Sequence, residues 1–152
     1  MQTELQDKAL ESVPFPGGHD SRRVRPYITA DNKTHYDALT RGELLLPCCG
    51  ACVGVGAPVG ACCTRCGALD RTWQRCSGRG VVHSWVRYHR AYLPEFESLV
   101  PYAVIAAKLD EGPILFGRWL SVREPRIDGL VRGVVERWAD GFCGLAFREH
   151  TP

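Results

Sequence analysis

The sequence predicts a mainly β protein with a short N-terminal helix, in which a cysteine ribbon precedes a five-stranded barrel. Three observations lead to this fold class. The chain has 152 residues, enough for one compact domain or two very small ones. Two Cys-x-x-Cys motifs occur in its first half, at Cys49 and Cys52 and at Cys63 and Cys66. After them, short runs of β-forming residues alternate with turn residues.

Residues 1–30 are predicted to be a flexible N-terminal arm. Pro14, Pro16, Gly17, Gly18 and Pro26 interrupt this segment, and no apolar period is sustained in it. Charged side chains also break every stretch that could serve as the apolar core of a signal peptide. We therefore expect a cytoplasmic location, where paired cysteines are more often metal ligands or redox centres than disulfides.

Residues 31–46 are predicted to form a short helical segment. Asp31 or Asn32 can cap the helix, and Tyr36 and Leu39 lie three residues apart on one face. Gly42 suits the position just past the helix end. A helix of this length needs a surface to pack against.

Residues 47–70 are predicted to form a zinc ribbon. Each Cys-x-x-Cys turn presents two thiolates, and ten residues separate Cys52 from Cys63, so the two turns can close one tetrahedral site. Four sulfur ligands saturate the metal, so we expect a structural role for Zn²⁺. Iron is the competing ion, because a rubredoxin-like site binds it with the same four thiolates.

The register of the ligands is open, because a second cysteine precedes each turn. Cys48 and Cys62 offer a three-residue spacing in place of the two-residue one. We prefer the inner set, since both turns then have the same spacing. Cys76 and Cys143 lie outside any pair and are expected to be core or surface thiols.

Residues 44–64 carry no charge and are about long enough to span a bilayer. Pro47, Pro58 and four glycines interrupt them, however, and would leave backbone groups unsatisfied in lipid. Thiol-rich turns explain the same composition, so no membrane span is expected.

Residues 71–152 are predicted to form the barrel. The Asp110-Glu111-Gly112-Pro113 segment is a turn, and Asp140-Gly141 is a hairpin signal. Five short strands suit an OB-fold, although their spacing does not separate it from other small barrels. The expected strands are residues 81–88, 102–109, 114–120, 133–138 and 144–148.

The segment from residue 71 to residue 92 combines basic and aromatic residues and contains no acid. Guanidinium groups beside aromatic faces suit a ligand with phosphates and rings, either single-stranded nucleic acid or a nucleotide-like cofactor such as coenzyme A. In the competing interpretation, the tryptophans pack in the hydrophobic core and the arginines form a solvent-exposed face of the strand. The net charge of +2 indicates no nucleic-acid partner by itself. The basic residues are Arg71, Arg75, Arg79, Arg87 and Arg90, and the aromatic ones are Trp73, Trp85, Tyr88 and Tyr92.

The order of several short motifs resembles one family over about residues 30 to 150. That family comprises the acyl-CoA-associated zinc-ribbon and OB-fold proteins that partner thiolases. Val53 departs from the pattern, since the family usually has glycine after the first cysteine turn. The motifs are Arg41-Gly42-Glu43-Leu44, Leu46-Pro47, the two cysteine turns with Gly67, Ser77-Gly78, His89-Arg90, Pro101-Tyr102 and Leu109-Asp110-Glu111-Gly112-Pro113.

The resemblance implies a rubredoxin-like ribbon in which Cys49, Cys52, Cys63 and Cys66 hold the metal. It also implies that this chain has no catalytic residues and is not an enzyme by itself. A thiolase-superfamily partner would carry out 3-ketoacyl-CoA thiolysis or related carbon–carbon bond chemistry, while this accessory subunit helps bind or channel acyl-CoA. The small subunit of a benzoylsuccinyl-CoA-type thiolase is one candidate of about this size.

Six residues are the predicted surface for coenzyme A or for the partner. The alternative function is a single-stranded nucleic-acid-binding ribbon and OB module, based on the acid-free segment. A rubredoxin-like electron carrier is disfavoured, because it has no need of the long segment after the cysteines. The six residues are Arg87, Tyr88, His89, Arg90, Pro94 and Phe96.

Overall fold

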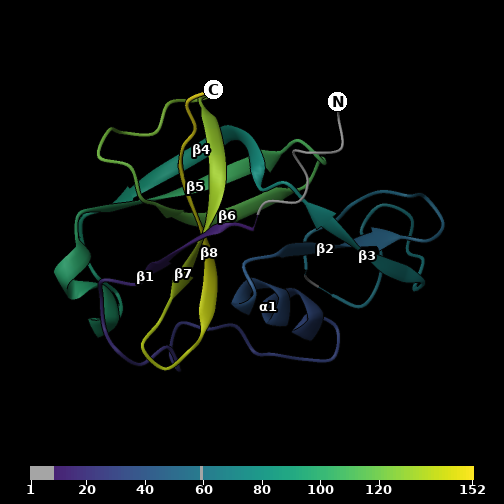
Figure 1. The fold of residues 1–152 in the computed structure, drawn as a ribbon, viewed down its shortest axis with the longest axis horizontal. Coiled ribbons are helices and arrows are strands. Elements are labelled where there is room, and N and C mark those ends of the chain that lie inside the picture. Colours follow the sequence, from purple (N-terminus) through teal and green to yellow (C-terminus); the bar gives the residue numbers. More distant parts are fainter. Residues whose placement is uncertain (1–8, 59) are drawn as a thin grey trace.

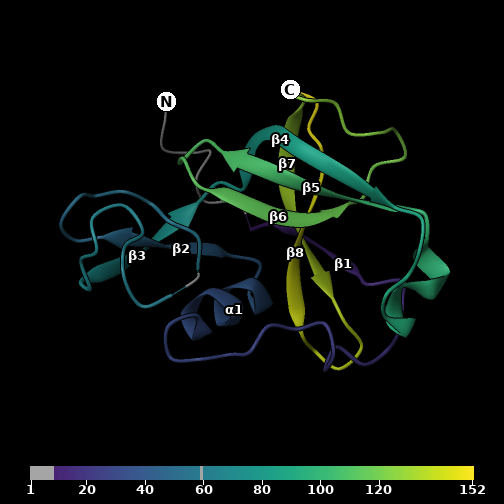
Figure 2. The same ribbon diagram turned by 180° about the vertical axis from the view of Figure 1, so that it is seen from behind.

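The computed structural model describes residues 9–58 and 60–152. Figures 1 and 2 show a barrel beside a small two-stranded sheet, with the single α-helix of the described residues lying below that sheet. The elements in chain order are β1 (Glu11–Pro14), α1 (Lys33–Thr40), β2 (Leu44–Cys49), β3 (Arg71–Cys76), β4 (Arg79–Tyr88), the 3₁₀ helix η1 (Pro94–Leu99), β5 (Tyr102–Leu109), β6 (Ile114–Trp119), β7 (Leu130–Arg137) and β8 (Cys143–Glu149).

Five strands close the barrel in the order β4, β5, β6, β8 and β7, and β7 returns to β4. The pairing is antiparallel except between β6 and β8, which run parallel where Arg118 lies opposite Ala146 and Trp119 opposite Phe147. The predicted fold class, mainly β with a five-stranded barrel, is confirmed. Closure leaves none of these strands with a fully unpaired edge.

Alternating side chains of the barrel strands fill its interior. Val82, Ile105, Val135 and Phe147 are fully buried there. The predicted hairpin at Asp140-Gly141 joins β7 to β8, and Gly141 has a φ of 88°, a left-handed conformation that favours glycine. All five expected barrel strands are present, with ends that differ from the prediction by at most a few residues.

The predicted helix forms α1, which packs on β2 and β8. Asn32 is its N-cap residue, and Gly42 adopts a φ of 75° just past its end. Leu39 of α1 and Leu44 of β2 belong to the same apolar core as the barrel residues. The helix therefore fills the space between the small sheet and the barrel.

One segment pairs differently from the prediction. Residues 71–76 were assigned to the barrel, but they form β3, which pairs antiparallel with β2 from Leu44 opposite Cys76 to Cys49 opposite Arg71. The cysteine turns are thus carried on a sheet of their own. No local signal indicates this pairing, because the strand that follows the second turn folds back along the strand that precedes the first, which lies elsewhere in the chain.

The predicted arm contains ordered structure in its described part. β1 runs parallel to β7, with Glu11 opposite Val134 and Pro14 opposite Arg137. Beyond it, the buried Ser21 donates hydrogen bonds from its backbone N–H and its hydroxyl to Asp140, at 2.9 and 2.8 Å. The sequence analysis missed β1 because a four-residue strand that ends in proline has no recognisable period. Residues 1–8 of the predicted arm lie outside the described residues.

Among the helices that the structure describes, none has the length and apolar character needed to cross a membrane. The uncharged residues 44–58 and 60–64 instead form β2 and the loops around the cysteine turns. This agrees with the expectation that they are not a membrane span.

Candidate functional site

The structure brings together the four predicted ligand cysteines. The Sγ atoms of Cys49, Cys52, Cys63 and Cys66 all lie within 4.8 Å of one another. The Cys49–Cys66 and Cys52–Cys63 Sγ distances are 3.6 and 3.7 Å. A tetrahedron of sulfurs about 2.3 Å from a central ion has edges of about 3.8 Å, so the four thiols fit a metal ion.

Both cysteine turns have the same backbone shape. In each, the residue after the second cysteine donates its N–H to the carbonyl of the first cysteine: Val53 to Cys49 at 3.0 Å and Gly67 to Cys63 at 2.8 Å. Both residues have positive φ, 58° at Val53 and 76° at Gly67. The left-handed conformation favours glycine at position 53, so valine is strained there.

Backbone N–H groups point at two of the sulfurs. Cys52 and Ala51 donate to Cys49 Sγ, both at 3.4 Å, and hold the pKa of Cys49 below its usual range. Hydrogen bonds from Arg65 and Cys66 lower the pKa of Cys63 to about 6. Because the thiolate is the metal-binding form, Cys49 and Cys63 are preorganised for a cation, whereas hydrogen bonds with the other three cysteines raise the pKa of Cys66 to about 11.

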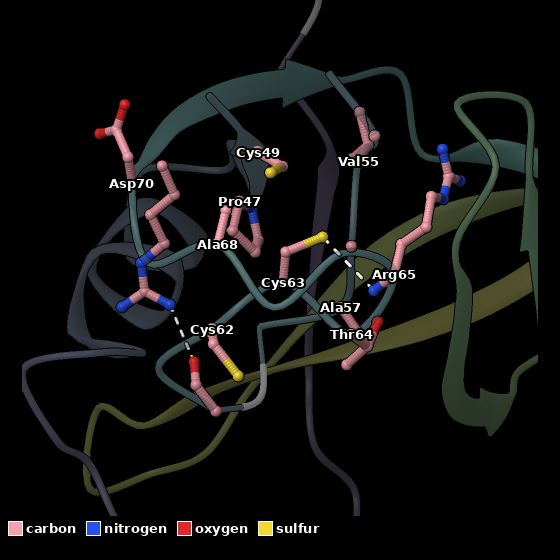
Figure 3. Close-up of a pocket in the computed structure, with 14 residues that line it drawn as sticks. Pro47, Cys49, Val55, Ala57, Cys62, Cys63, Thr64, Arg65, Ala68 and Asp70 are labelled. Carbon is pink, nitrogen blue, oxygen red and sulfur yellow. Dashed lines mark hydrogen bonds between the residues drawn. The ribbon is translucent and has the colours of Figure 1, made fainter. Parts of the chain in front are cut away.

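The neighbouring cysteines do not join the cluster. Cys48 is nearly buried on β2, and its thiol donates to the Val53 carbonyl at 3.6 Å. Cys62 is exposed, and Figure 3 shows its side chain directed away from Cys49 and Cys63. Of the two registers considered, the arrangement favours the inner one.

The two isolated cysteines, Cys76 and Cys143, are buried in the apolar core. Burial raises the pKa of Cys76 to about 12, with the nearby charges of Glu111 and Cys48 acting in the same direction. Burial also raises the pKa of Cys143. Both are therefore thiols that pack as apolar side chains.

A hollow of about 80 Å³ adjoins the cysteine cluster (Figure 3). Pro47, Val55 and Ala57 line its apolar side. Arg71 closes another side by donating to the Gly60 carbonyl at 2.8 Å and pairing with Asp31 at 2.7 Å. The hollow is smaller than a typical ligand pocket. The residues that line it include those of the second cysteine turn.

A larger hollow of about 350 Å³, the aromatic groove, lies on the outside of the barrel. Four of its rings come from β4, η1, β5 and β6, the other two come from the residues after β1 and β7, and Val104 and Gly117 line it between them. The groove also contains an ion pair between Arg118 and Glu136, in which the Arg118 Nε lies 3.1 Å from Glu136 Oε1. Its six aromatic residues are Phe15, Tyr88, Phe96, Tyr102, Phe116 and Trp138.

The rings of the groove form a connected wall. Tyr102 stacks on Tyr88 and on Phe96, with centroid distances of 5.2 Å in both pairs. Phe15 stacks on Trp138 at 3.6 Å and meets Phe96 edge-on at 5.5 Å. The N-terminal segment thus contributes part of this wall, which the sequence analysis had no signal to find.

Two of the six residues predicted to face coenzyme A or a partner, Tyr88 and Phe96, line the groove. His89 and Arg90 are exposed beside it along the chain, and Pro94 is exposed at the start of η1. Arg87 pairs with Glu124 at 2.7 Å, away from the groove lining. The sequence analysis missed Tyr102, Phe116 and Trp138 as groove residues because other strands carry them.

The comparisons with known proteins agree with this architecture. Residues 73–136 match the family model described as the ChsH2 C-terminal OB-fold domain. A chain of the solved Ltp2-ChsH2(DUF35) aldolase is 28% identical, with a TM-score of 0.73 over 82% of this chain and 98% of that one. A DUF35-family protein of unknown function from Sulfolobus solfataricus, 10% identical, has the same fold, with a TM-score of 0.60 over 87% of this chain and 93% of its own.

A curated relative from Thermomonospora curvata has the name "Probable enoyl-CoA hydratase alpha subunit". It is 32% identical over 127 residues, which are 84% of this chain and 35% of that protein. The chain therefore spans about a third of the length of this relative.

The fold, the cysteine cluster and the matches are those of a cysteine ribbon followed by an OB-fold barrel. Residues 73–136, less than half of the chain, are similar to ChsH2 C-terminal OB-fold domains, in agreement with the resemblance found in the sequence.

Proposed function

We propose that the chain is a non-catalytic accessory subunit that binds a thiolase-superfamily enzyme and helps hold or channel its acyl-CoA. The nucleophile and the general base lie on the partner, which acts on the carbon–carbon bond of a 3-ketoacyl-CoA. The observation that carries the proposal is the likeness to a chain of the Ltp2-ChsH2(DUF35) aldolase, which this chain matches over 98% of that chain's length.

Two features of the chain support an accessory role. A tetrahedral set of four cysteines leaves a bound metal no open position for substrate. The buried thiols Cys76 and Cys143 have pKa values raised by burial, which disfavours the thiolate that a nucleophile requires. Both observations support a location of the catalytic groups on a second chain.

The names of the similar proteins support a CoA thioester as the ligand. One solved neighbour is an aldolase, and the curated relative has the name of an enoyl-CoA hydratase subunit. The order of the motifs in this sequence favours a thiolase-type partner among such enzymes. The chemistry that these reactions share is an acyl group activated as a thioester.

A reconstitution experiment tests the partner. The full chain is combined with a thiolase-superfamily enzyme from the same organism, and cleavage of a 3-ketoacyl-CoA is measured for each protein alone and for the pair. We expect a stable complex whose activity exceeds that of the enzyme alone, and no activity from this chain alone. Cleavage by the isolated chain at the rate of the pair contradicts the accessory role, and activation of a hydratase in place of the thiolase contradicts the thiolase assignment.

We propose Zn²⁺ as the resident ion, held by Cys49, Cys52, Cys63 and Cys66. Its chemistry there is to cross-link the two turns. The Cys66→Ala variant is expected to lose the metal and to unfold around the turns, because metal binding contributes folding free energy. Metal content by mass spectrometry and circular dichroism measure both effects.

The matched control for this variant is Cys62→Ala, which changes an exposed thiol next to the cluster. It is expected to keep one zinc per chain and to change the unfolding free energy by no more than about 0.5 kcal/mol. Loss of the metal from Cys62→Ala and not from Cys66→Ala contradicts the ligand set. A red iron chromophore in the purified protein contradicts zinc.

The second candidate function is binding of single-stranded nucleic acid, which the acid-free segment at residues 71–92 favours. The structure weakens this candidate, because Arg71 and Arg87 pair with Asp31 and Glu124, and Arg75 pairs with Glu43. Carboxylates outside the segment therefore neutralise much of its charge. Binding of an oligonucleotide with an affinity that falls steeply with salt would favour this candidate.

A further inference from the structure

We propose that the aromatic groove binds the adenine nucleotide of an acyl-CoA, with the purine ring in the groove and the phosphates toward Arg90. This inference rests on the proposed function and assigns one part of its ligand to one site. Phe15, Tyr88, Phe96, Tyr102, Phe116 and Trp138 supply the rings.

The shape and lining of the groove suit a planar ring. Tyr102 stacks with Tyr88 and with Phe96, with interplanar angles of 17° and 30°. Phe116 is 73% exposed on β6, while Val104 and Gly117 also line the groove. A flat heteroaromatic ring gains stacking from such faces, whereas a flexible acyl chain gains only apolar contact.

The polar groups of the groove match an aminopurine. Arg118 is 16% exposed and uses Nε and Nη2 on Glu136, while its Nη1 has no hydrogen-bond partner in the described part of the chain. The groove thus offers the Arg118 Nη1 group as a hydrogen-bond donor beside the Glu136 carboxylate as an acceptor. Adenine presents ring-nitrogen acceptors beside an amino donor, so both groups of the pair can be satisfied by one ring edge.

The charge around the groove suits phosphates outside it. Because Arg118 and Glu136 neutralise each other, the groove itself favours a neutral ring. Arg90 is exposed and pairs with no carboxylate among the described residues. Its guanidinium carbon lies 5.9 Å from the Tyr92 ring, which meets Tyr88 of the groove at 6.4 Å. One accessible cation therefore lies close to the ring site, as a mononucleotide requires.

The experiment measures binding by calorimetry with the full chain and three probes: 3′,5′-ADP, coenzyme A and pantetheine. We expect 3′,5′-ADP to bind and to compete with coenzyme A, and pantetheine to compete with neither. Phe116→Ala is expected to weaken 3′,5′-ADP binding by roughly 5- to 150-fold, the range measured for loss of one stacking partner. Arg90→Gln is expected to weaken 3′,5′-ADP binding as well. It should also reduce the slope of the logarithm of the affinity against the logarithm of the salt concentration by about one.

The matched control is Val86→Ala, which removes a 48% exposed apolar side chain from β4 outside the groove. It is expected to leave the affinity for 3′,5′-ADP unchanged. Failure of 3′,5′-ADP to bind, or equal binding by Phe116→Ala and the unchanged protein, overturns the inference. Tighter binding of an oligonucleotide at the same residues overturns it in favour of nucleic acid.

These outcomes separate the inference from the proposed function. If pantetheine thioesters bind and the partner is activated while 3′,5′-ADP does not bind, the accessory role stands and the adenine site is wrong. If 3′,5′-ADP binds in the groove while partner activity does not depend on this chain, the adenine site stands and the accessory role is wrong.

Discussion

Val53 carries backbone strain in the first cysteine turn. Its φ of 58° is rare for any side chain and worst for a β-branched one. The side chain is 74% exposed, so it gains little from packing in return. Gly67 occupies the equivalent position of the second turn without this strain.

Replacing Val53 by glycine is therefore expected to stabilise the folded protein. Release of a left-handed conformation contributes about 1 kcal/mol, reduced by the added freedom of the unfolded chain. Urea unfolding of the metal-loaded protein measures the difference. Gly67→Ala, which adds a side chain at the equivalent position of the second turn, is expected to be destabilising, and an equal effect of both substitutions would contradict the argument.

His35 couples the packing of α1 to pH. It is 4% exposed, and its Nδ1 lies 2.9 Å from the Leu45 carbonyl, to which a neutral imidazole can donate. Burial lowers the pKa of His35 from its ordinary 6.5, and the bond to Leu45 offsets part of this. Below pH 6.5 the unfolded chain gains a proton that the folded chain does not, so stability is lost as pH falls through this range.

A His35→Asn variant tests this linkage. Asparagine can donate to the Leu45 carbonyl but does not titrate, so the variant should be less stable at pH 7.5 because of lost packing. Between pH 7.5 and 5.5 its unfolding free energy should fall less than that of the unchanged protein. Parallel pH profiles from urea titrations would show that His35 does not carry the effect.

At the scale of elements, β1 and the residues after it are attached through close backbone contacts. Leu10 donates to the Gly42 carbonyl at 2.7 Å and Phe15 to the Arg137 carbonyl at 2.8 Å. A Cβ added at Gly17 would lie 2.2 Å from the Glu95 carbonyl oxygen, so only glycine allows this approach to η1. These contacts hold Phe15 on Trp138 in the groove.

Gly17→Ala is expected to displace this segment and to cost about 1–3 kcal/mol of unfolding free energy, the usual cost of overpacking. Hydrogen exchange of residues 9–18 should become faster in the same variant. Gly56→Ala is the matched control, since an added Cβ meets no atom within 4 Å there. Equal exchange rates in the two variants would contradict the close packing at Gly17.

For the molecule as a whole, the small sheet and the barrel share one apolar core. Leu39, Leu44 and Leu46 belong to the same buried cluster as Ile105 and Phe147 of the barrel. Loss of structure around the cysteine turns therefore exposes side chains on which the barrel packs. Metal binding and barrel stability are expected to be coupled.

Removal of the metal by a chelator should lower the melting temperature of the whole chain in a single transition. Each lost kcal/mol lowers it by about 3 °C for a chain of this length. Scanning calorimetry with circular dichroism follows the change, and added zinc should reverse it. A barrel transition that stays at its original temperature after chelation would show that the two parts are independent.

Much of the fold was predictable because its signals are local. Gly42 after the helix, Asp140-Gly141 in the last hairpin and the run of β-forming residues in β4 each depend on neighbouring residues. The two cysteine turns belong to this group, since their two-residue spacing presents paired sulfurs. Strand β1 and the pairing of β3 with β2 were missed, because the partners of these strands lie elsewhere in the chain.

By itself, the sequence determined the mainly β class, the helix α1, the barrel strands and the candidate metal ligands Cys49, Cys52, Cys63 and Cys66. Turn chemistry, capping and side-chain period act over a few residues, so one chain segment is enough to reveal them. Only the tertiary structure decided that β7 returns to β4, that Arg71 is neutralised by Asp31, and that Phe15 meets Trp138 in an aromatic groove. These contacts join segments far apart in the chain, and their free energy depends on the closed barrel that brings them together.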